Sequence, residues 1–203
     1  MDILIVANGT IRNKSFYRNI IKKADKIIAA DGGADNCIKI GITPDYVIGD
    51  FDSISKKTKS RFKGILIHDK SQDRTDLEKA ISLAKKLKCT KLTIIGAIGS
   101  RIDHTISNII SLLNTSVPSE ILDETNNVFV VEKEIKLTGK KGDIVSVIPI
   151  SNVRGLYYKG LKWNPKSKNV GTGWIGVSNR MISNKATIKL KSGKIIVIKS
   201  RGK

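Results

Sequence analysis

Short apolar runs alternate with amphipathic segments throughout residues 1–118, and this alternation limits the possible folds more than any other feature. The apolar runs, each ending in Gly, Asp or another turn former, are residues 3–7, 26–30, 46–48, 65–68 and 92–95. The segments with helical spacing are residues 15–24, 34–40, 55–62, 75–88 and 102–113. Strands and helices in alternation predict a Rossmann-like α/β domain, in which helices cover both faces of a parallel sheet.

After Val117-Pro118 the pattern changes to strands without helices. Predicted strands cover residues 128–131, 144–150 and 156–158. The segment ATIKLKSGKIIVIKS, residues 186–200, alternates apolar and polar residues on both sides of a Ser-Gly pair and predicts a β-hairpin. We therefore expect two domains, an α/β domain over residues 1–118 and a smaller antiparallel β-sandwich over residues 119–203.

Bulk composition indicates a cytoplasmic protein. Hydrophobic residues make up 40% of the sequence, which is enough for a buried core. Cys37 and Cys89 show neither a metal-ligand spacing nor a CxxC pair, which fits a reducing compartment. The amino terminus, MDILIVANGT, lacks the basic start and the long apolar run of a signal peptide. No apolar run approaches the roughly 20 residues that a membrane span requires.

The net charge of +19 is unevenly distributed, because no acidic residue follows Asp143. Such a basic segment could bind a polyanion, or it could be a solvated lysine-rich surface. Aromatic residues make up only 5% of the chain, which is little material for stacking on nucleic-acid bases. The composition therefore favours the solvated surface.

Acidic and glycine-rich segments follow the predicted strands. They are DGG at 31–33, GDFDS at 49–53, SQDRTD at 71–76 and GAIGSRIDH at 96–104. Ligands of doubly wound sheets bind beyond the carboxyl ends of the strands, so these segments should meet at one edge. In an extended backbone the side chains of Asp50 and Asp52 would point to the same side and repel each other. A cation should therefore lie between them.

Each of these acidic residues also has a structural explanation. Asp52 could cap the following helix, and Asp31 could stabilise a turn. Thr75 and Glu78 have the spacing of a capping box, so Asp76 could simply favour the helix dipole. Their joint occurrence at one edge of a basic protein favours a shared function.

Mg²⁺ suits this arrangement, because it is commonly held by one or two carboxylates together with phosphate oxygens and water. Asp50 and Asp52 are the candidate ligands, and Asp76 is the candidate third. His68 and His104 show no ligand spacing with a cysteine, which argues against zinc. The sequence also lacks the GxSxG motif of serine hydrolases.

Phosphate groups would need a separate binding element. The sequence has no GxxxxGK[ST] P-loop. Residues 96–99, GAIG, lead from a predicted strand towards a helix, whose amino end could bind an anion with Arg101 as a clamp. A GxxG segment alone is weak evidence for such a site.

Taken together, these motifs resemble the thiamine pyrophosphokinase family. The resemblance is carried by DGGADN at 31–36, TPDYVIGDFDSI at 43–54, QDRTDLEKAI at 72–81 and GSRIDHTISN at 99–108. It continues through VSVIPI, GLKWN and the VSN at 177–179, so it covers nearly the whole chain in order. The strongly basic carboxyl-terminal part departs from the family pattern.

The resemblance implies a Mg²⁺-dependent enzyme that transfers diphosphate from ATP to the hydroxyl of thiamine, giving thiamine diphosphate and AMP. It also implies a homodimer with sites at the subunit interface. The implied metal ligands are Asp50, Asp52 and Asp76. The residues expected at ATP and the other substrate groups are Asp31, Gln72, Thr75, Arg101, Asp103, His104 and Asn108.

Further roles follow from the same resemblance. Ser178 and Asn179 correspond to the thiamine-binding segment, and either Trp163 or Trp174 could lie against the thiamine rings. We assign catalytic roles to three of the charged residues. Arg101 would counter the charge of the transferred group, and either Asp76 or Asp103 would accept the hydroxyl proton.

Two other functions were weighed. A related diphosphokinase could act on a pterin-type hydroxymethyl heterocycle and would keep the carboxylates, but the VSN segment at 177–179 favours thiamine. A basic nucleic-acid-binding protein would bind less tightly as salt increases, but it would leave the acidic motifs unexplained. We expect small-molecule partners and neither membrane nor nucleic-acid binding.

Overall fold

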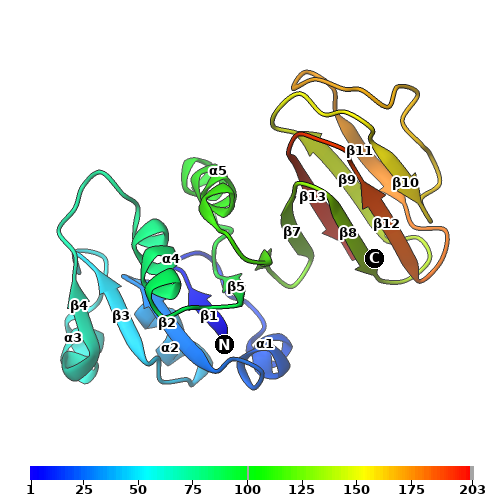
Figure 1. Cartoon of the computed structure of the whole chain (residues 1–203). Coiled ribbons are helices and arrows are strands. Elements are labelled where there is room, and N and C mark those ends of the chain that lie inside the picture. Colours follow the sequence, from blue (N-terminus) through cyan, green and yellow to red (C-terminus); the bar gives the residue numbers. More distant parts are fainter. Residues whose placement is uncertain (100, 202–203) are drawn as a thin grey trace. The chain divides into compact units, whose positions relative to one another are not determined.

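The computed structural model describes residues 1–99 and 101–201, and the chain divides into two units, Met1–Glu124 and Thr125–Lys203 (Figure 1). The division falls after Glu124 rather than after Pro118, where the sequence placed it. The reason is β6 (Ser119–Leu122), which pairs in parallel with β5 (Lys91–Ile95) and so belongs to the α/β unit.

The first unit contains a parallel sheet, as predicted. Its other strands are β1 (Asp2–Val6), β2 (Lys26–Ala30), β3 (Tyr46–Gly49) and β4 (Leu66–His68). The strands of this unit follow the order β6-β5-β1-β2-β3-β4, and neighbouring strands pair in parallel. In β1, Ile3, Leu4, Ile5 and Val6 are all buried, as expected for a central strand covered on both faces.

Helices connect the strands of this sheet. They are α1 (Lys14–Ile21), α2 (Gly33–Ile40), α3 (Lys56–Arg61), α4 (Asp76–Lys86) and α5 (Ile102–Ser111), with short 3-10 helices η1 (Lys63–Ile65) and η2 (Leu112–Asn114). Leu4 and Val6 pack in one cluster with Tyr17 of α1 and Cys37 of α2. Ile5 points to the opposite face, because side chains alternate along a strand, and α4 packs against the same central strands.

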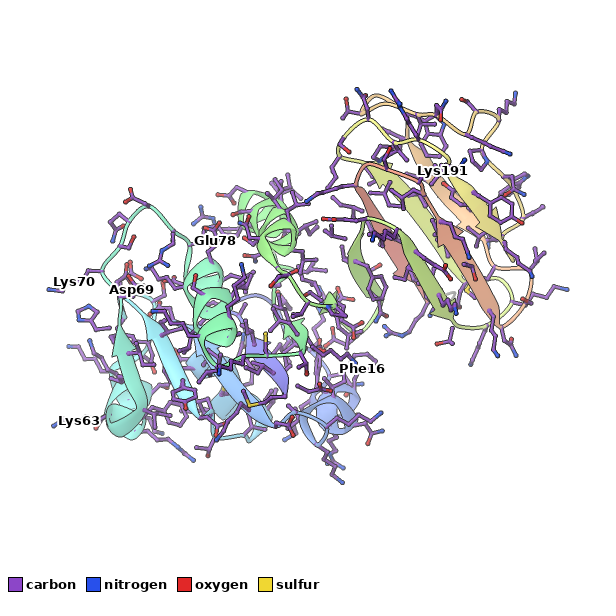
Figure 2. The ribbon with its side chains drawn as sticks, in the orientation of Figure 1. Phe16, Lys63, Asp69, Lys70, Glu78 and Lys191 are labelled. Atoms are coloured by element: carbon purple, nitrogen blue, oxygen red, sulfur yellow. The ribbon has the colours of Figure 1, made fainter. Side chains whose placement is uncertain are left out.

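Helix α4 begins with the predicted capping box. The Thr75 hydroxyl accepts from the Glu78 backbone N–H at 3.3 Å, and the Glu78 carboxylate accepts from the Thr75 backbone N–H at 2.9 Å. Figure 2 shows Glu78 at this end of the helix. The box fixes where α4 starts and therefore where Asp76, its first residue, is held.

The second unit is the predicted antiparallel sandwich. One sheet has the order β11-β9-β13-β7 and the other β10-β12-β8. Their bounds are β7 (Asn126–Val131), β8 (Glu134–Thr138), β9 (Ile144–Pro149), β10 (Tyr157–Lys159), β11 (Gly176–Arg180), β12 (Lys185–Lys189) and β13 (Ile195–Ser200). A single core cluster joins buried residues of both sheets, including Val147 and Val197 from one and Leu137 and Ile188 from the other.

The predicted hairpin over residues 186–200 is wrong. Strands β12 and β13 form, but β12 pairs with β8 and β10, whereas β13 pairs with β7 and β9. Ser192, between the two strands, bridges to Arg154 instead of closing a two-stranded turn. The alternation of apolar residues identifies a strand with one buried face, but both sheets of a sandwich offer such a face.

No helix in the described part of the chain is long and apolar enough to cross a membrane.

Candidate active site

The loop after β3 brings Asp50 and Asp52 together at a bend. The strand ends at Gly49, and Phe51 has a left-handed backbone with φ 68°, so the two aspartates are not in an extended strand as expected. The Asp52 backbone N–H donates to Asp50 Oδ1 at 3.3 Å. A bulky residue rarely adopts this conformation, and the buried Phe51 ring, stacked on His68 with centroids 5.3 Å apart, anchors it.

Asp31 completes an acidic cluster with these two residues. One carboxylate oxygen from each of Asp31, Asp50 and Asp52 lies within 4.8 Å of the others. Asp31 is only 1% exposed, and its Oδ2 accepts from the Ser53 backbone N–H at 3.1 Å. Its Oδ1 is buried and has no hydrogen-bond partner among the described residues. The absence of a side chain at Gly49 leaves room for Asp31 here, because a Cβ at Gly49 would lie 2.7 Å from the Asp31 Cβ.

The electrostatics of the cluster fit a bound cation. Burial raises the pKa of Asp31, and the charge of Asp76 raises it further. The pKa of Asp50 is lowered, chiefly by the Asp52 backbone N–H, with Lys79 contributing in the same direction. The buried Asp31 Oδ1, which has no donor among the described residues, lies beside the carboxylates of Asp50 and Asp52. Together they form a set of hard oxygen ligands that suits Mg²⁺.

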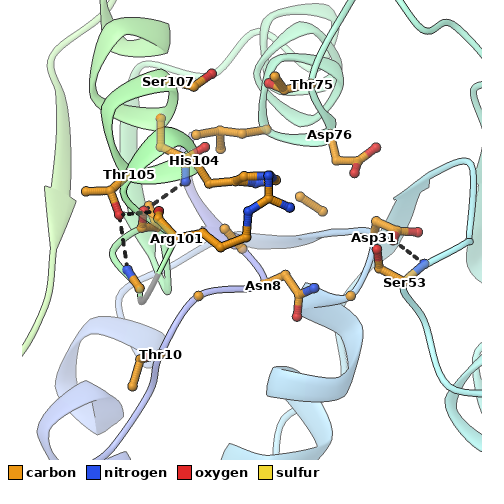
Figure 3. Close-up of a pocket in the computed structure, with 18 of the residues that line it drawn as sticks. Asn8, Thr10, Asp31, Ser53, Thr75, Asp76, Arg101, His104, Thr105 and Ser107 are labelled. Carbon is orange, nitrogen blue, oxygen red and sulfur yellow. Dashed lines mark hydrogen bonds between the residues drawn. The ribbon is translucent and has the colours of Figure 1, made fainter.

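Asp76 lies near this cluster but is not one of its three members. Its charge acts on Asp31, and both residues line the same pocket, on its right in Figure 3. Its Oδ1 is 3.1 Å from the Nζ of Lys79, which is 2% exposed. The cluster found in the described residues is therefore Asp31, Asp50 and Asp52, whereas the sequence predicted Asp50, Asp52 and Asp76.

A cavity of about 880 Å³ lies at the carboxyl edge of the sheet (Figure 3). Predicted site residues that line it are Asp31, Thr75, Asp76, Arg101, Asp103, His104 and Asn108. Gln72 is not among its lining residues, but the Gln72 amide donates to Asp50 Oδ2 at 3.3 Å. One edge of the sheet thus collects most of the α/β-unit residues that the motifs indicated.

The loop after β1 also belongs to the site, although it was not predicted from the sequence. Asn8, Gly9 and Thr10 line the cavity, and the Gly9 backbone N–H donates to the Gly96 carbonyl at 2.5 Å. The buried Asn36 amide holds this loop by donating to the carbonyls of Ala7 and Gly9. The Asn-Gly pair directly after the first strand is a turn signal at the ligand-binding edge and could have identified the loop.

Arg101 and Asp103 form a two-point ion pair at the start of α5. Arg101 Nε and Nη2 lie 3.2 Å and 2.5 Å from the two oxygens of Asp103. Both side chains are exposed, and the hydrogen bond from Arg101 lowers the pKa of Asp103 to about 2. The Asn108 amide donates to the Ala97 carbonyl at 2.8 Å and fixes the preceding loop against the helix. A guanidinium that lines the cavity and binds a carboxylate through two nitrogens has the geometry that a phosphate in place of Asp103 would also accept.

In the second unit, Asn179 is a structural anchor for Trp163. Asn179 is 8% exposed, its Oδ1 accepts from the Trp163 backbone N–H at 3.1 Å, and its amide donates to the Trp163 carbonyl at 2.7 Å. The Trp163 ring is 52% exposed, with the Lys162 ammonium 4.5 Å from its centroid. Trp174 instead packs against the core of the sandwich. Trp163 is thus the more exposed of the two tryptophans, with Lys162 over one face of its ring.

Ser178 lies beside this anchor on β11. Its backbone is left-handed, with φ 61°, and its N–H donates to Ser146 Oγ at 3.2 Å. The pairing of β11 with β9 is irregular between Gly176 and Asn179. This bulge leaves Ser178 exposed while Asn179 is buried.

Comparison with known proteins agrees with these motifs. The model of the thiamin pyrophosphokinase catalytic domain matches residues 17–121, and the model of the vitamin B1 binding domain of thiamin pyrophosphokinase matches residues 129–195. The chain belongs to the thiamine pyrophosphokinase family. The catalytic match falls within the α/β unit and the vitamin B1 match within the sandwich of this family member.

Named relatives of this thiamine pyrophosphokinase family member span most of its length. Thiamine pyrophosphokinase of Bacillus subtilis is 27% identical over 185 residues, which cover 85% of this chain and 86% of the relative. The crystal structure of thiamine pyrophosphokinase from Bacillus subtilis aligns with a TM-score of 0.85 and 25% identity over 100% of both chains. Thiamin pyrophosphokinase from Candida albicans shares the fold, with a TM-score of 0.85 and 18% identity over 99% of this chain and 89% of its own.

Asp35 holds the end of the acidic loop and gives a first prediction. Its carboxylate accepts hydrogen bonds from the Ser55 backbone N–H at 2.9 Å, from the Ser55 hydroxyl at 2.7 Å and from the Thr58 hydroxyl. Burial would raise the pKa of Asp35, but these hydrogen bonds together lower it. Asp35→Asn should therefore lower the free energy of unfolding at pH 7 by about 1–3 kcal/mol.

The sign of its pH dependence follows from the lowered pKa. The contribution of Asp35 is fully present above its unfolded pKa of about 3.9 and is lost as the pH falls through the lower folded pKa. Urea unfolding of wild type and Asp35→Asn should thus differ more at pH 7 than at pH 3. Asp73→Asn, in an exposed loop, is the control. An equal difference at both pH values would contradict the role of the ionised carboxylate.

Proposed function

We propose that this protein transfers the diphosphate group of ATP to the hydroxyl of thiamine, giving thiamine diphosphate and AMP. The observation that carries the proposal is the cluster of Asp31, Asp50 and Asp52, whose oxygens lie within 4.8 Å of one another in a unit that matches the family's catalytic domain. Diphosphate transfer requires positioning and neutralisation of charge more than covalent catalysis, and this cluster is suited to both.

Asp31, Asp50 and Asp52 would hold Mg²⁺, and Asp76 would supply a further oxygen at the same pocket. The orphaned Oδ1 of Asp31 supports this assignment, because a buried carboxylate oxygen without a donor is costly unless a cation binds it. When bound, Mg²⁺ would neutralise phosphate charge and orient the diphosphate group. The Gln72 amide, which donates to Asp50, would keep that ligand in place.

Arg101, which lines the same pocket as Asp31 and Asp76, would bind the phosphate chain. Its guanidinium is exposed, and its fork already makes two hydrogen bonds to a carboxylate, the geometry that a phosphate also accepts. Thr75, His104 and Asn108 line the same pocket and would contact ATP. Asn8 and Thr10, from the loop after β1, extend this set.

The acceptor of the hydroxyl proton is Asp76 or Asp103, each of which is ion-paired, Asp76 with Lys79 and Asp103 with Arg101. Both carboxylates line the pocket. Arg101 lowers the pKa of Asp103 to about 2, which makes Asp103 a weak base while the two are paired. Near-normal turnover of both Asp76→Asn and Asp103→Asn would show that neither residue is the base.

Thiamine would be bound through the sandwich unit. Trp163 offers an exposed aromatic face, and Ser178 is an exposed polar residue next to its anchor Asn179. A cationic thiazolium ring is attracted to such an aromatic face. The match to the vitamin B1 binding domain over residues 129–195 supports this role.

We further propose that the protein is a homodimer, and α5 provides a test. Ile102, Ile106 and Ile110 lie on one face of α5 and are 70%, 52% and 50% exposed, which is unusual for large apolar side chains in a row. A second copy of the chain would bury this face. Ile106→Asp should raise the dimer dissociation constant by at least about tenfold, because burying an isoleucine contributes roughly 1.5–3 kcal/mol.

Analytical ultracentrifugation of wild type and Ile106→Asp over a range of concentrations would measure this effect. Lys86→Asp, at an exposed position of α4, is the control for added negative charge. An unchanged dimer in Ile106→Asp would place the interface elsewhere, and a monomeric wild type would contradict the dimer itself.

The activity is tested by incubating the purified protein with ATP, Mg²⁺ and thiamine and following AMP and thiamine diphosphate. Equal amounts of both products, formed only with Mg²⁺, are expected. AMP formed only with a pterin-type hydroxymethyl heterocycle would change the substrate and keep the ATP site. Absence of AMP with either acceptor would overturn the proposed reaction. Cytoplasmic location stays a prediction from the sequence.

A further inference from the structure

Lys79 occupies an unfavourable position for a charged side chain. It is 2% exposed and lies in the first turns of α4, at the end of the helix that carries partial positive charge. Both burial and the helix dipole oppose an ammonium group there. A methionine would fill the same space without either penalty. The charge itself must therefore be stabilised by its surroundings.

Two carboxylates, those of Asp76 and Asp50, interact with the charge of Lys79. Its Nζ lies 3.1 Å from Asp76 Oδ1, and its charge also acts on Asp50. Among the ion pairs of residues 1–99 and 101–201, this is the one that includes any of the carboxylates of Asp31, Asp50, Asp52 and Asp76. Two neutral groups donate hydrogen bonds to Asp50, namely the Gln72 amide and the Asp52 backbone N–H.

We infer that Lys79 is a positioning residue of the acidic site: its buried ammonium is a permanent countercharge that holds Asp76 and keeps the carboxylates together without bound metal. This inference builds on the proposed function and assigns a role to a residue that contacts neither ATP nor thiamine in it.

The pairing also accounts for the composition of the acidic cluster. Asp76 Oδ1 is held by Lys79, and Asp76 is not one of the three carboxylates that lie within 4.8 Å of one another, those of Asp31, Asp50 and Asp52. Three carboxylates are then left to gather around a divalent cation, and the ion pair of Asp76 with Lys79 is made through Oδ1. The Lys79 ammonium thus pairs with Asp76, whereas Asp31, Asp50 and Asp52 form the cluster for the divalent cation.

The inference is tested with Lys79→Met, which removes the charge and keeps an aliphatic side chain of similar length. In EDTA, Lys79→Met should lower the melting temperature by roughly 10 °C, since it leaves carboxylates without their buried partner. Saturating Mg²⁺ should restore at least half of that loss and should raise the wild-type value by less. Lys86→Met, at an exposed position of the same helix, should change neither value.

A second substitution separates charge from packing without any metal. Lys79→Met/Asp76→Asn should melt higher in EDTA than Lys79→Met, because removing one negative charge offsets the lost positive one. If Lys79→Met is insoluble, recovery of soluble protein in the double variant answers the same question. No gain in the double variant would overturn the countercharge role.

Binding of Mn²⁺ to the wild type, followed by electron paramagnetic resonance, distinguishes failure of this inference from failure of the metal site. When the wild type binds Mn²⁺, an equal loss of melting temperature for Lys79→Met in EDTA and in Mg²⁺ overturns the inference, because lost packing alone gives that result. When the wild type binds no Mn²⁺, the proposed metal site fails. The melting temperatures of Lys79→Met and of the double variant Lys79→Met/Asp76→Asn in EDTA then decide the role of Lys79.

Discussion

Asp50→Asn is expected to lower the rate of AMP formation from ATP and thiamine by roughly a hundredfold to a thousandfold. Asp50 contributes an oxygen to the cluster with Asp31 and Asp52, and metal stabilisation of phosphate charge accounts for several kcal/mol at about 1.36 kcal/mol per tenfold in rate. Asparagine keeps the shape of the side chain but offers a neutral oxygen in place of a charged one.

The same substitution should stabilise the protein in the absence of metal. Three carboxylates within 4.8 Å repel one another, so removing one charge relieves that repulsion. Asp50→Asn should therefore melt higher than wild type in EDTA and gain less on addition of Mg²⁺. Turnover with ATP and thiamine and melting curves with and without Mg²⁺ measure both effects.

Asp73→Asn serves as the matched control, because Asp73 lies in an exposed loop outside the cluster. It should leave the rate unchanged. A rate for Asp50→Asn within about threefold of wild type would remove Asp50 from the metal site.

Arg101→Ala should lower turnover by on the order of a hundredfold to a thousandfold, the effect seen when a donor that stabilises transition-state charge is removed. The loss should fall on kcat more than on KM for ATP, because this charge develops during transfer. Arg101→Lys keeps the positive charge but cannot make the two parallel bonds that the guanidinium makes to Asp103. It should therefore recover only part of the activity.

Steady-state kinetics of the two variants with ATP and thiamine provide the measurement. Arg61→Ala, on α3, removes an arginine that does not line the cavity and should not change kcat. If Arg101→Ala and Arg101→Lys both turn over like wild type, Arg101 is a partner of Asp103 and has no part in transfer.

The parallel sheet was predictable from local patterns, whereas part of the sandwich was not. The runs that became β1, β2 and β5 are apolar on both faces, which is the mark of strands buried between helices. Residues 186–200 also show a clear strand pattern, but that pattern does not identify which of two facing sheets each strand joins. Partner choice there depends on contacts with distant segments, such as that of Ser192 with Arg154.

The acidic site was predicted from motifs, but its internal arrangement needed three dimensions. Asp50 and Asp52 were identified by their spacing, but their carboxylates lie close together because the backbone of Phe51 between them is left-handed. Lys79 drew no attention in the sequence, since one lysine on a helix of a lysine-rich chain is usually solvated. Its burial against Asp76 depends on packing that no local pattern encodes.

The separation of β12 and β13 into different sheets affects how the sandwich assembles during synthesis. Strand β13 lies between β7 and β9 and joins them in one sheet, with Ile195 opposite both Val131 and Pro149. Until residues 195–200 leave the ribosome, β7 and β9 lack the strand that connects them. Closure of the sandwich therefore waits for long-range pairing, which is slower than hairpin formation and leaves strand edges open to other chains in the meantime.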